Sequence, residues 1–227
     1  MPLRPWKFLL PLTAALALAA TACSGDTAEE PGDTTRGDLG EASQEDLSAL
    51  LVEGEVPADP PEADLSGLPA QPDESTPVHE RAAWHLLSDV SGIAGGVDPD
   101  AVAECPEDLS TVCTLTYGGV DLEFPVTSEE VAGGVEFSFE YPEMPVTREF
   151  LEDWLRHYSE AEAVFCDTDD VVVMVPGAED PADFLCYAQD GGVAWVDSAE
   201  DTVSPYEAYM INGGSLAFYQ KLQTSED

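Results

Sequence analysis

The stretch ECPEDLSTVCTLTYGGVDLEFPV, residues 104–126, holds two cysteines, a Gly-Gly pair and a run in which apolar residues stand at every second position. The same alternation returns over residues 135–141 (VEFSFEY). Strict alternation is typical of antiparallel strands with one face buried and the other in water. Gly118-Gly119 and Gly133-Gly134 precede the two runs and supply turn chemistry. The stretch therefore predicts an antiparallel sheet built from hairpins.

Helical spacing replaces the alternation in two other stretches. Residues 76–90 (TPVHERAAWHLLSDV) carry apolar residues at every third or fourth position behind a Thr-Pro pair, a common helix start. Residues 147–158 (TREFLEDWLRHY) repeat this spacing, and Thr76 and Thr147 are the expected N-caps of the two helices. We expect two amphipathic helices, each with one face packed on a sheet.

The helical stretch, the cysteines and the glycine pairs follow one another in the same order in the first and second parts of the chain. Each helix is followed by two cysteines, by a Gly-Gly pair five residues after the second cysteine, and by another Gly-Gly pair before a strand-like run. The repetition predicts an α+β fold of two tandem modules, 76–143 and 144–227. Each module is expected to be a helix packed on a small antiparallel sheet with one disulfide.

The first 22 residues have the parts of an export signal. Arg4 and Lys7 precede an apolar run of about 15 residues, short of the ~20 that a membrane-spanning helix needs, and small residues follow. Cys23 comes next, within ATACSGD (residues 20–26). This ending resembles the lipobox of bacterial lipoproteins, especially actinobacterial ones, although Ala20 stands where leucine is usual. The resemblance implies cleavage before Cys23, a diacylglycerol thioether on its sulfur and often a third acyl chain on its amino group. The alternative is an ordinary signal peptide followed by an incidental cysteine.

The chain has five cysteines, an odd number that leaves one without a disulfide partner. If Cys23 carries lipid, four remain, and we expect two disulfides formed in an oxidising compartment: Cys105, Cys113, Cys166 and Cys186. Four cysteines allow three pairings. Equivalence of the two modules favours Cys105 with Cys113 and Cys166 with Cys186.

Charge limits the partners of the chain. It has 47 acidic and 7 basic residues, a net charge of −40 that becomes −42 when Arg4 and Lys7 leave with the signal. Such a charge repels nucleic acid and anionic headgroups, so membrane attachment would depend on the lipid of Cys23. Residues 24–75 are rich in acidic residues and proline and have almost no aromatic residues. We expect residues 23–75 to be a disordered acidic linker, with at most a short amphipathic helix over 44–56.

Two further resemblances concern the folded part. The stretch 104–126 resembles short secreted or membrane-anchored actinobacterial domains of unknown function, in which Cys-Pro opens a strand and a second cysteine precedes a glycine-turn hairpin. The match is weaker in the second module, where Asp167 follows the first cysteine. In architecture alone the chain is similar to tandem helix-plus-sheet proteins that inhibit β-lactamases. That resemblance implies a concave double sheet able to bind a protein.

No arrangement of residues points to catalysis. The three histidines, His79, His85 and His157, have no Gly-x-Ser-x-Gly or His-Glu-x-x-His motif around them. Asp167, Asp169 and Asp170 alternate as calcium ligands do, but the glycine and distal glutamate of a calcium loop are missing, so we expect a solvated acidic turn. We therefore expect a protein that is not an enzyme and uses no cofactor or metal.

Aromatic residues are the remaining indication of a binding surface, since exposed aromatic side chains on a sheet often anchor partners. About two-thirds of them are expected in the core; the candidates are Trp84, Trp154, Trp195, Phe137, Phe139, Tyr206, Tyr209, Phe218 and Tyr219. The leading hypothesis is an exported binding module, anchored by lipid to the outer face of the cell membrane, with an envelope or secreted protein as partner. The alternatives are a hydrolase with a site between the modules that uses His157, and a non-catalytic acidic lipoprotein that coats the surface.

Overall fold

The computed structural model describes residues 39, 42–132, 134–189 and 202–221. The predicted export signal, Cys23 and Trp195 lie outside these residues. The helices are α1 (Gln44–Leu50), α2 (Val78–Ala94) and α3 (Arg148–Ser159). The strands are β1 (Val52–Glu53), β2 (Val102–Glu104), β3 (Val112–Tyr117), β4 (Val120–Val131), β5 (Gly134–Phe139), β6 (Met144–Thr147), β7 (Ala163–Cys166), β8 (Val171–Met174), β9 (Leu185–Gln189), β10 (Val203–Met210) and β11 (Leu216–Gln220).

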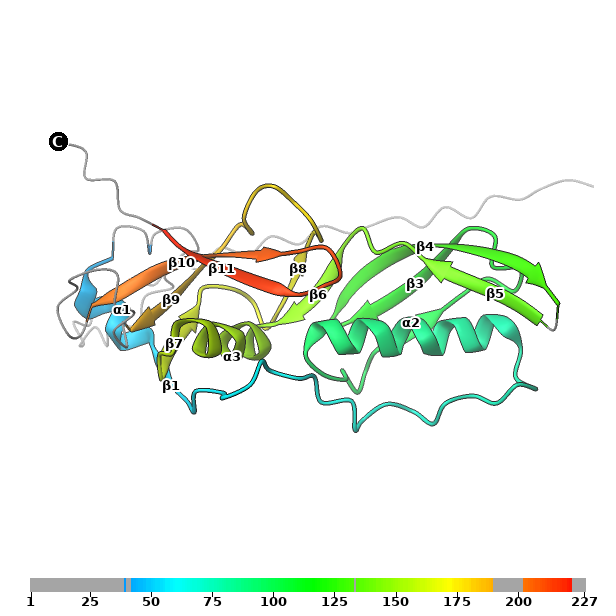
Figure 1. Ribbon diagram of the computed structural model, residues 1–227, viewed down its shortest axis with the longest axis horizontal. Coiled ribbons are helices and arrows are strands. Elements are labelled where there is room, and N and C mark those ends of the chain that lie inside the picture. Colours follow the sequence, from blue (N-terminus) through cyan, green and yellow to red (C-terminus); the bar gives the residue numbers. More distant parts are fainter. Residues whose placement is uncertain (1–38, 40–41, 133, 190–201, 222–227) are drawn as a thin grey trace, which may run out of the picture. The chain divides into compact units, whose positions relative to one another are not determined.

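The strands form antiparallel sheets (Figure 1). One sheet has the order β2-β3-β4-β5, a second has the order β1-β7-β9-β10-β11, and β6 pairs with β8. The predicted strands over 120–126 and 135–141 are present as β4 and β5. The fold is therefore α+β with antiparallel sheets, as the alternating pattern predicts.

The strands that follow the two helices pair in the same order. After α2 the chain forms β2, β3, β4 and β5, each paired with the next. After α3 the corresponding order is β7, β9, β10 and β11, while β8 leaves this series to pair with β6. We call α2 with β2–β5 the first half and α3 with β7 and β9–β11 the second half.

Each helix buries its apolar face against the sheets. Leu86 and Val90 of α2 and Leu151 and Leu155 of α3 are fully buried within one core that includes strands of both halves. Thr147 caps α3 as predicted, because its hydroxyl accepts a hydrogen bond from the Phe150 N–H. The residue that precedes α2 is Pro77, so the cap expected at Thr76 lies one position too early.

The expected disordered linker is wrong for residues 42–75, which pack against the folded part. Gln44 of α1 exchanges two hydrogen bonds with the backbone of Val203, and Val52 of β1 pairs with Val164 of β7. Farther along, the Asp64 N–H donates to the Gly95 carbonyl, and the Trp84 indole donates to the Pro69 carbonyl. We call residues 52–69 the strap, which passes α3 and then α2 (Figure 1).

Among the described residues, no helix is both long and apolar enough to cross a membrane.

Candidate functional site

One side of α2 is left uncovered by the sheet and forms the first wall of a groove. His85, Ser88, Asp89, Gly92 and Ile93 line this side. Their spacing of three and four residues puts them on one face, while Leu86 and Val90 turn toward the core. The wall has open space above it, because a Cβ added to Gly92 would meet no atom within 4 Å.

The strand β5 and the residues after it form the second wall. Val135, Phe137 and Phe139 are half-buried and face α2, whereas Glu136 and Ser138 are exposed on the opposite face of the sheet. The aromatic rings form a continuous row: the centroids of Phe137 and Phe139 lie 5.7 Å apart and those of Phe139 and Tyr141 lie 6.3 Å apart. His85 of α2 joins the row, 5.7 Å from the ring of Phe137.

Two hollows lie end to end between these walls and share Asp89 and Tyr141. The hollow beside β5 has a volume of about 580 Å³. The second, of about 720 Å³, continues along α2 past Ile93 to Pro176 and the Asn212–Gly214 turn. We call the two together the α2 groove. Volumes of this size, lined by apolar and aromatic side chains with a few polar groups, are typical of binding sites.

A hydrogen bond marks the middle of the α2 groove. The hydroxyl of Tyr141 donates to the Asp89 carboxylate across 2.8 Å. Burial and this bond both raise the pKa of Tyr141, so the phenol keeps its proton at neutral pH. The pair thus holds one carboxylate in place beside the apolar hollows.

A larger hollow of about 820 Å³ lies where the strap, the end of α2 and the start of α3 meet. Several of its polar groups bind one another or the backbone. Arg148 forms an ion pair with Asp170, and the Asp98 carboxylate accepts from the Gly118 N–H at 2.6 Å. The Tyr117 hydroxyl donates to the Gly96 carbonyl at 2.6 Å, and burial, with Asp98 nearby, raises the pKa of Tyr117 to about 12. These contacts join the parts of the fold.

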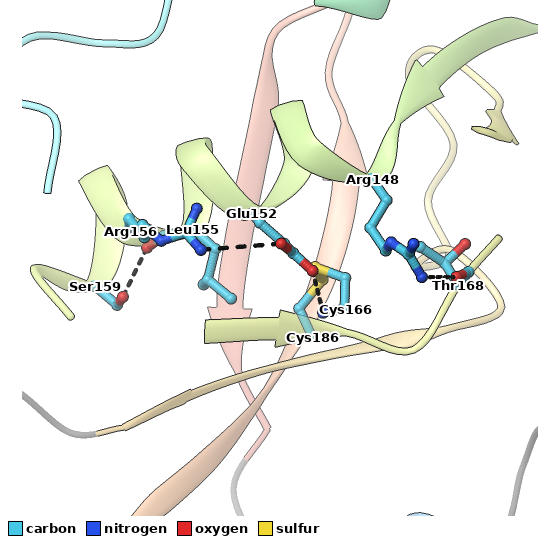
Figure 2. The surroundings of a disulfide bond; sticks show 8 residues. All are labelled: Arg148, Glu152, Leu155, Arg156, Ser159, Cys166, Thr168 and Cys186. Carbon is cyan, nitrogen blue, oxygen red and sulfur yellow. Dashed lines mark hydrogen bonds and ion pairs between the residues drawn. A yellow bond between two sulfur atoms is a disulfide. The ribbon is translucent and has the colours of Figure 1, made fainter. Parts of the chain in front are cut away.

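A buried pair of charges lies beside the second disulfide (Figure 2). Arg156 is 6% exposed and donates to the Asp153 carboxylate at 2.8 Å and to the Val52 carbonyl at 3.1 Å. Glu152, 9% exposed, accepts from the Cys166 N–H and lies 3.9 Å from Arg156. Burial raises the pKa of Glu152, against the opposing effects of the Cys166 N–H and the Arg156 guanidinium. Sequence patterns missed this pair because both residues belong to an ordinary amphipathic helix, and the strap that Arg156 binds was expected to be disordered.

The cysteines of the folded part form two disulfides, Cys105–Cys113 and Cys166–Cys186, the pairs favoured by equivalence of the two halves. In the second pair the cysteines face each other on β7 and β9. Disulfides of this kind are typical of proteins from oxidising compartments.

The histidines and the acidic turn lie apart from one another. His157 has its Nδ1 3.0 Å from the Pro57 carbonyl oxygen and its ring edge-to-face with Trp154, while His85 lies in the α2 groove. In the acidic turn, the Asp167 N–H donates to the Leu185 carbonyl and Asp170 pairs with Arg148. No group of three potential metal ligands is present among the described residues.

The candidate aromatic residues divide between the core and the surface. Tyr206 and Phe218 are buried, whereas Tyr219 is 59% exposed and packs against Tyr209. Of the candidates that the structure describes, only Phe137 and Phe139 line the α2 groove. Searches of protein-family models, of curated proteins and of solved structures find no match to the chain.

Proposed function

We propose that the chain is a lipid-anchored, extracytoplasmic binding module of the cell envelope, and that the α2 groove is its binding surface. The observation that carries the proposal is the row of half-buried aromatic rings, Phe137, Phe139 and Tyr141, beside two connected hollows. Rigid aromatic side chains that keep part of their surface in water contribute strongly to binding when a partner covers them. The partner is an envelope or secreted protein.

The lipid anchor is part of the proposal. Its support is the signal-like segment 1–22 followed by ATAC, together with an odd cysteine count in a chain whose other four cysteines form disulfides. On this proposal residues 1–22 are removed and Cys23 carries the lipid at the outer face of the membrane. Residues 24–43 then separate the lipid from α1.

We also propose that 76–143 and 144–227 are tandem copies of one module. The support is the shared strand order: β2, β3, β4 and β5 after α2, and β7, β9, β10 and β11 after α3, pair successively, while β8 pairs with β6. In each half the disulfide joins the region of the first strand to the second strand. Superposition of the two halves in a crystal structure of the mature chain tests this proposal. A helix that crosses its sheet in a different direction in each half would contradict it.

A non-catalytic role completes the proposal. A hydrolase would need a base aimed at a nucleophile. The ring of His157, the candidate base, instead contacts the Pro57 carbonyl of the strap through its Nδ1 and packs edge-to-face with Trp154. Its contacts are those of a residue that helps to hold the strap.

The lipid anchor is tested by the intact mass of the mature protein purified from its own envelope. The mass should show a chain that begins at Cys23 and carries diacylglycerol, and an unmodified Cys23 would contradict the anchor.

Binding in the groove is tested by crosslinking. A photo-crosslinking side chain at Gly92, where a Cβ has open space, should capture one partner protein in cells. The control is the same side chain at the exposed Thr114 of β3, outside the groove. Equal capture from both positions, or none from Gly92, would contradict binding in the groove.

A further inference from the structure

We propose that the occupant of the α2 groove is an extended segment of a basic protein, which adds to the free edge of β5 as a further antiparallel strand. This inference rests on the proposed function and identifies the chemistry of its partner. Three observations support it: the orientation of the β5 backbone, the side chains that share this orientation, and the distribution of charge around the edge.

Within the described part of the chain, no backbone group pairs with those along the outer edge of β5. β5 is the last strand of its sheet and pairs with β4 alone among the described strands. The Glu140 N–H donates to the Pro125 carbonyl, and the register pairs Thr127 with Ser138. Because the N–H and C=O groups of successive residues point to opposite sides of a strand, those of Val135, Phe137 and Phe139 point away from β4. These are the groups that a further strand would bind.

The same three residues direct their side chains toward α2. Residues directly opposite each other in an antiparallel pair have their side chains on one face of the sheet. In an added strand, the residues opposite Val135, Phe137 and Phe139 would therefore project into the hollow beside β5. The backbone bonds would supply affinity, and the aromatic hollow would select apolar side chains at alternate positions.

The acidic residues on the face of β5 opposite α2 favour a basic partner. Glu136 and Glu140 are exposed on the face opposite α2, and Glu129 of β4 lies directly across from Glu136. A second copy of this chain, with its net charge of −40, would place carboxylates against these carboxylates, and like charges on opposing strands are destabilising. Lysine or arginine on the added strand would instead face Glu136 and Glu140. The edge is thus protected against self-association while it remains open to a basic segment.

The geometry defines a pattern for the segment: apolar residues opposite Phe139, Phe137 and Val135, and basic residues opposite Glu140 and Glu136. A suitable probe is the capped peptide Lys-Val-Thr-Val-Lys-Val, which matches these positions in antiparallel order. Binding of this probe to the full mature chain is measured by NMR titration. The amide signals of Val135, Phe137 and Phe139 are expected to shift and to exchange more slowly with solvent.

Matched controls separate the backbone from the side chains. Methylation of the amide nitrogens of the first two valines of the probe removes two donors and should weaken binding at least tenfold. Replacement of both lysines by glutamate should do the same. In the protein, Val135→Pro removes an outward N–H and should also weaken binding at least tenfold, whereas Val135→Thr keeps that N–H and should bind normally. The peptide controls remain decisive if Val135→Pro fails to fold.

The outcomes distinguish this inference from the proposed function. If the Gly92 crosslink captures a partner and the probe binds equally well with and without N-methylation, the strand-addition inference is overturned while the binding function stands. Equal binding of the lysine and glutamate probes would overturn the basic character of the partner. If neither the probe nor a cellular partner binds the groove, both proposals fail.

Discussion

The two halves of the molecule have the same strand order but differ in how deeply the side chains of their last strand are buried. In the second half, Leu216 and Phe218 of β11 are only 6% and 1% exposed, and Tyr158 of α3 packs against the ring of Phe218. In the first half, Phe137 and Phe139 of β5 are half-buried beside a hollow of about 580 Å³. The helix accounts for part of the difference, because α2 presents His85 and Asp89 to β5 where α3 presents an aromatic ring. One arrangement of strands can thus end in a closed core or in an open groove.

The largest expected effect comes from removal of the buried cation of the second half. Arg156→Ala leaves Glu152 buried without its partner and removes the hydrogen bond that holds Val52 of the strap to α3. Loss of one member of a buried charge pair costs roughly 3–5 kcal/mol, so the free energy of unfolding in urea should fall by about this amount. Arg148→Ala is the control, since its partner Asp170 is 89% exposed and such pairs contribute at most ~1 kcal/mol. Equal effects of the two substitutions would refute the role of Arg156.

Phenylalanine truncation on the two last strands tests the comparison itself. Phe218→Ala should cost roughly 3–5 kcal/mol because it leaves a cavity in a closed core. Phe137→Ala should cost only about 1–2 kcal/mol, because part of that side chain is already in water. Chemical denaturation of both variants measures the difference. Similar costs would mean that the groove closes in solution.

The disulfides should differ by a smaller amount. Their loops span 8 residues for Cys105–Cys113 and 20 residues for Cys166–Cys186. On the chain-entropy model these loops contribute about 2.5 and 3.3 kcal/mol. Replacement of Cys166 and Cys186 by alanine should therefore lower the free energy of unfolding by about 0.8 kcal/mol more than replacement of Cys105 and Cys113. Thermal unfolding of the two double variants provides the comparison. A greater loss from the shorter loop would show that contacts around Cys105 outweigh the loop entropy.

The smallest expected effect is a change of stability with pH, and it comes from Glu152 of the second half. Because the folded state raises the pKa of Glu152 above its ordinary 4.5, it binds this proton more tightly than the unfolded state does. The stability from this proton is fully present below pH 4.5 and is lost as the pH rises through the folded pKa. Glu152→Gln should therefore gain stability relative to the wild type as the pH rises over that range, as measured by urea unfolding. Glu149→Gln, which removes a charge from the first turn of α3, is the control; the same trend there would assign the effect to net charge.

Patterns among neighbouring residues predicted several helices and strands and the disulfide pairs. Alternation gave β4 and β5, helical spacing gave α2 and α3, and the repeated order of cysteines and glycines gave the disulfide pairs. β10 was not predicted because Pro205 interrupts its alternation. The structure tolerates this proline since its missing N–H would face Lys221, one residue beyond the end of β11.

Long-range contacts account for the parts that the sequence did not predict. Residues 42–75 have the composition of a disordered chain, yet Gln44 binds Val203, 159 residues away. The composition of a segment indicates how much apolar surface it can bury by itself. It does not indicate whether the backbone of the segment will form hydrogen bonds with a sheet built from other parts of the chain. The α2 groove was missed for a similar reason. Alternation shows that Phe137 and Phe139 share a face, but their half-burial depends on which residues α2 places opposite them.

The strap has a consequence for the order of folding. A growing chain releases its amino-terminal residues first, but β1 cannot pair until Val164 is available, more than a hundred residues later. Gln44 must wait still longer, for Val203. We therefore expect the earliest residues of the folded part to dock last, after α3 and α2 have formed. Such distant contacts slow folding, so the chain should pass through a state in which the sheets are built and the strap is still free.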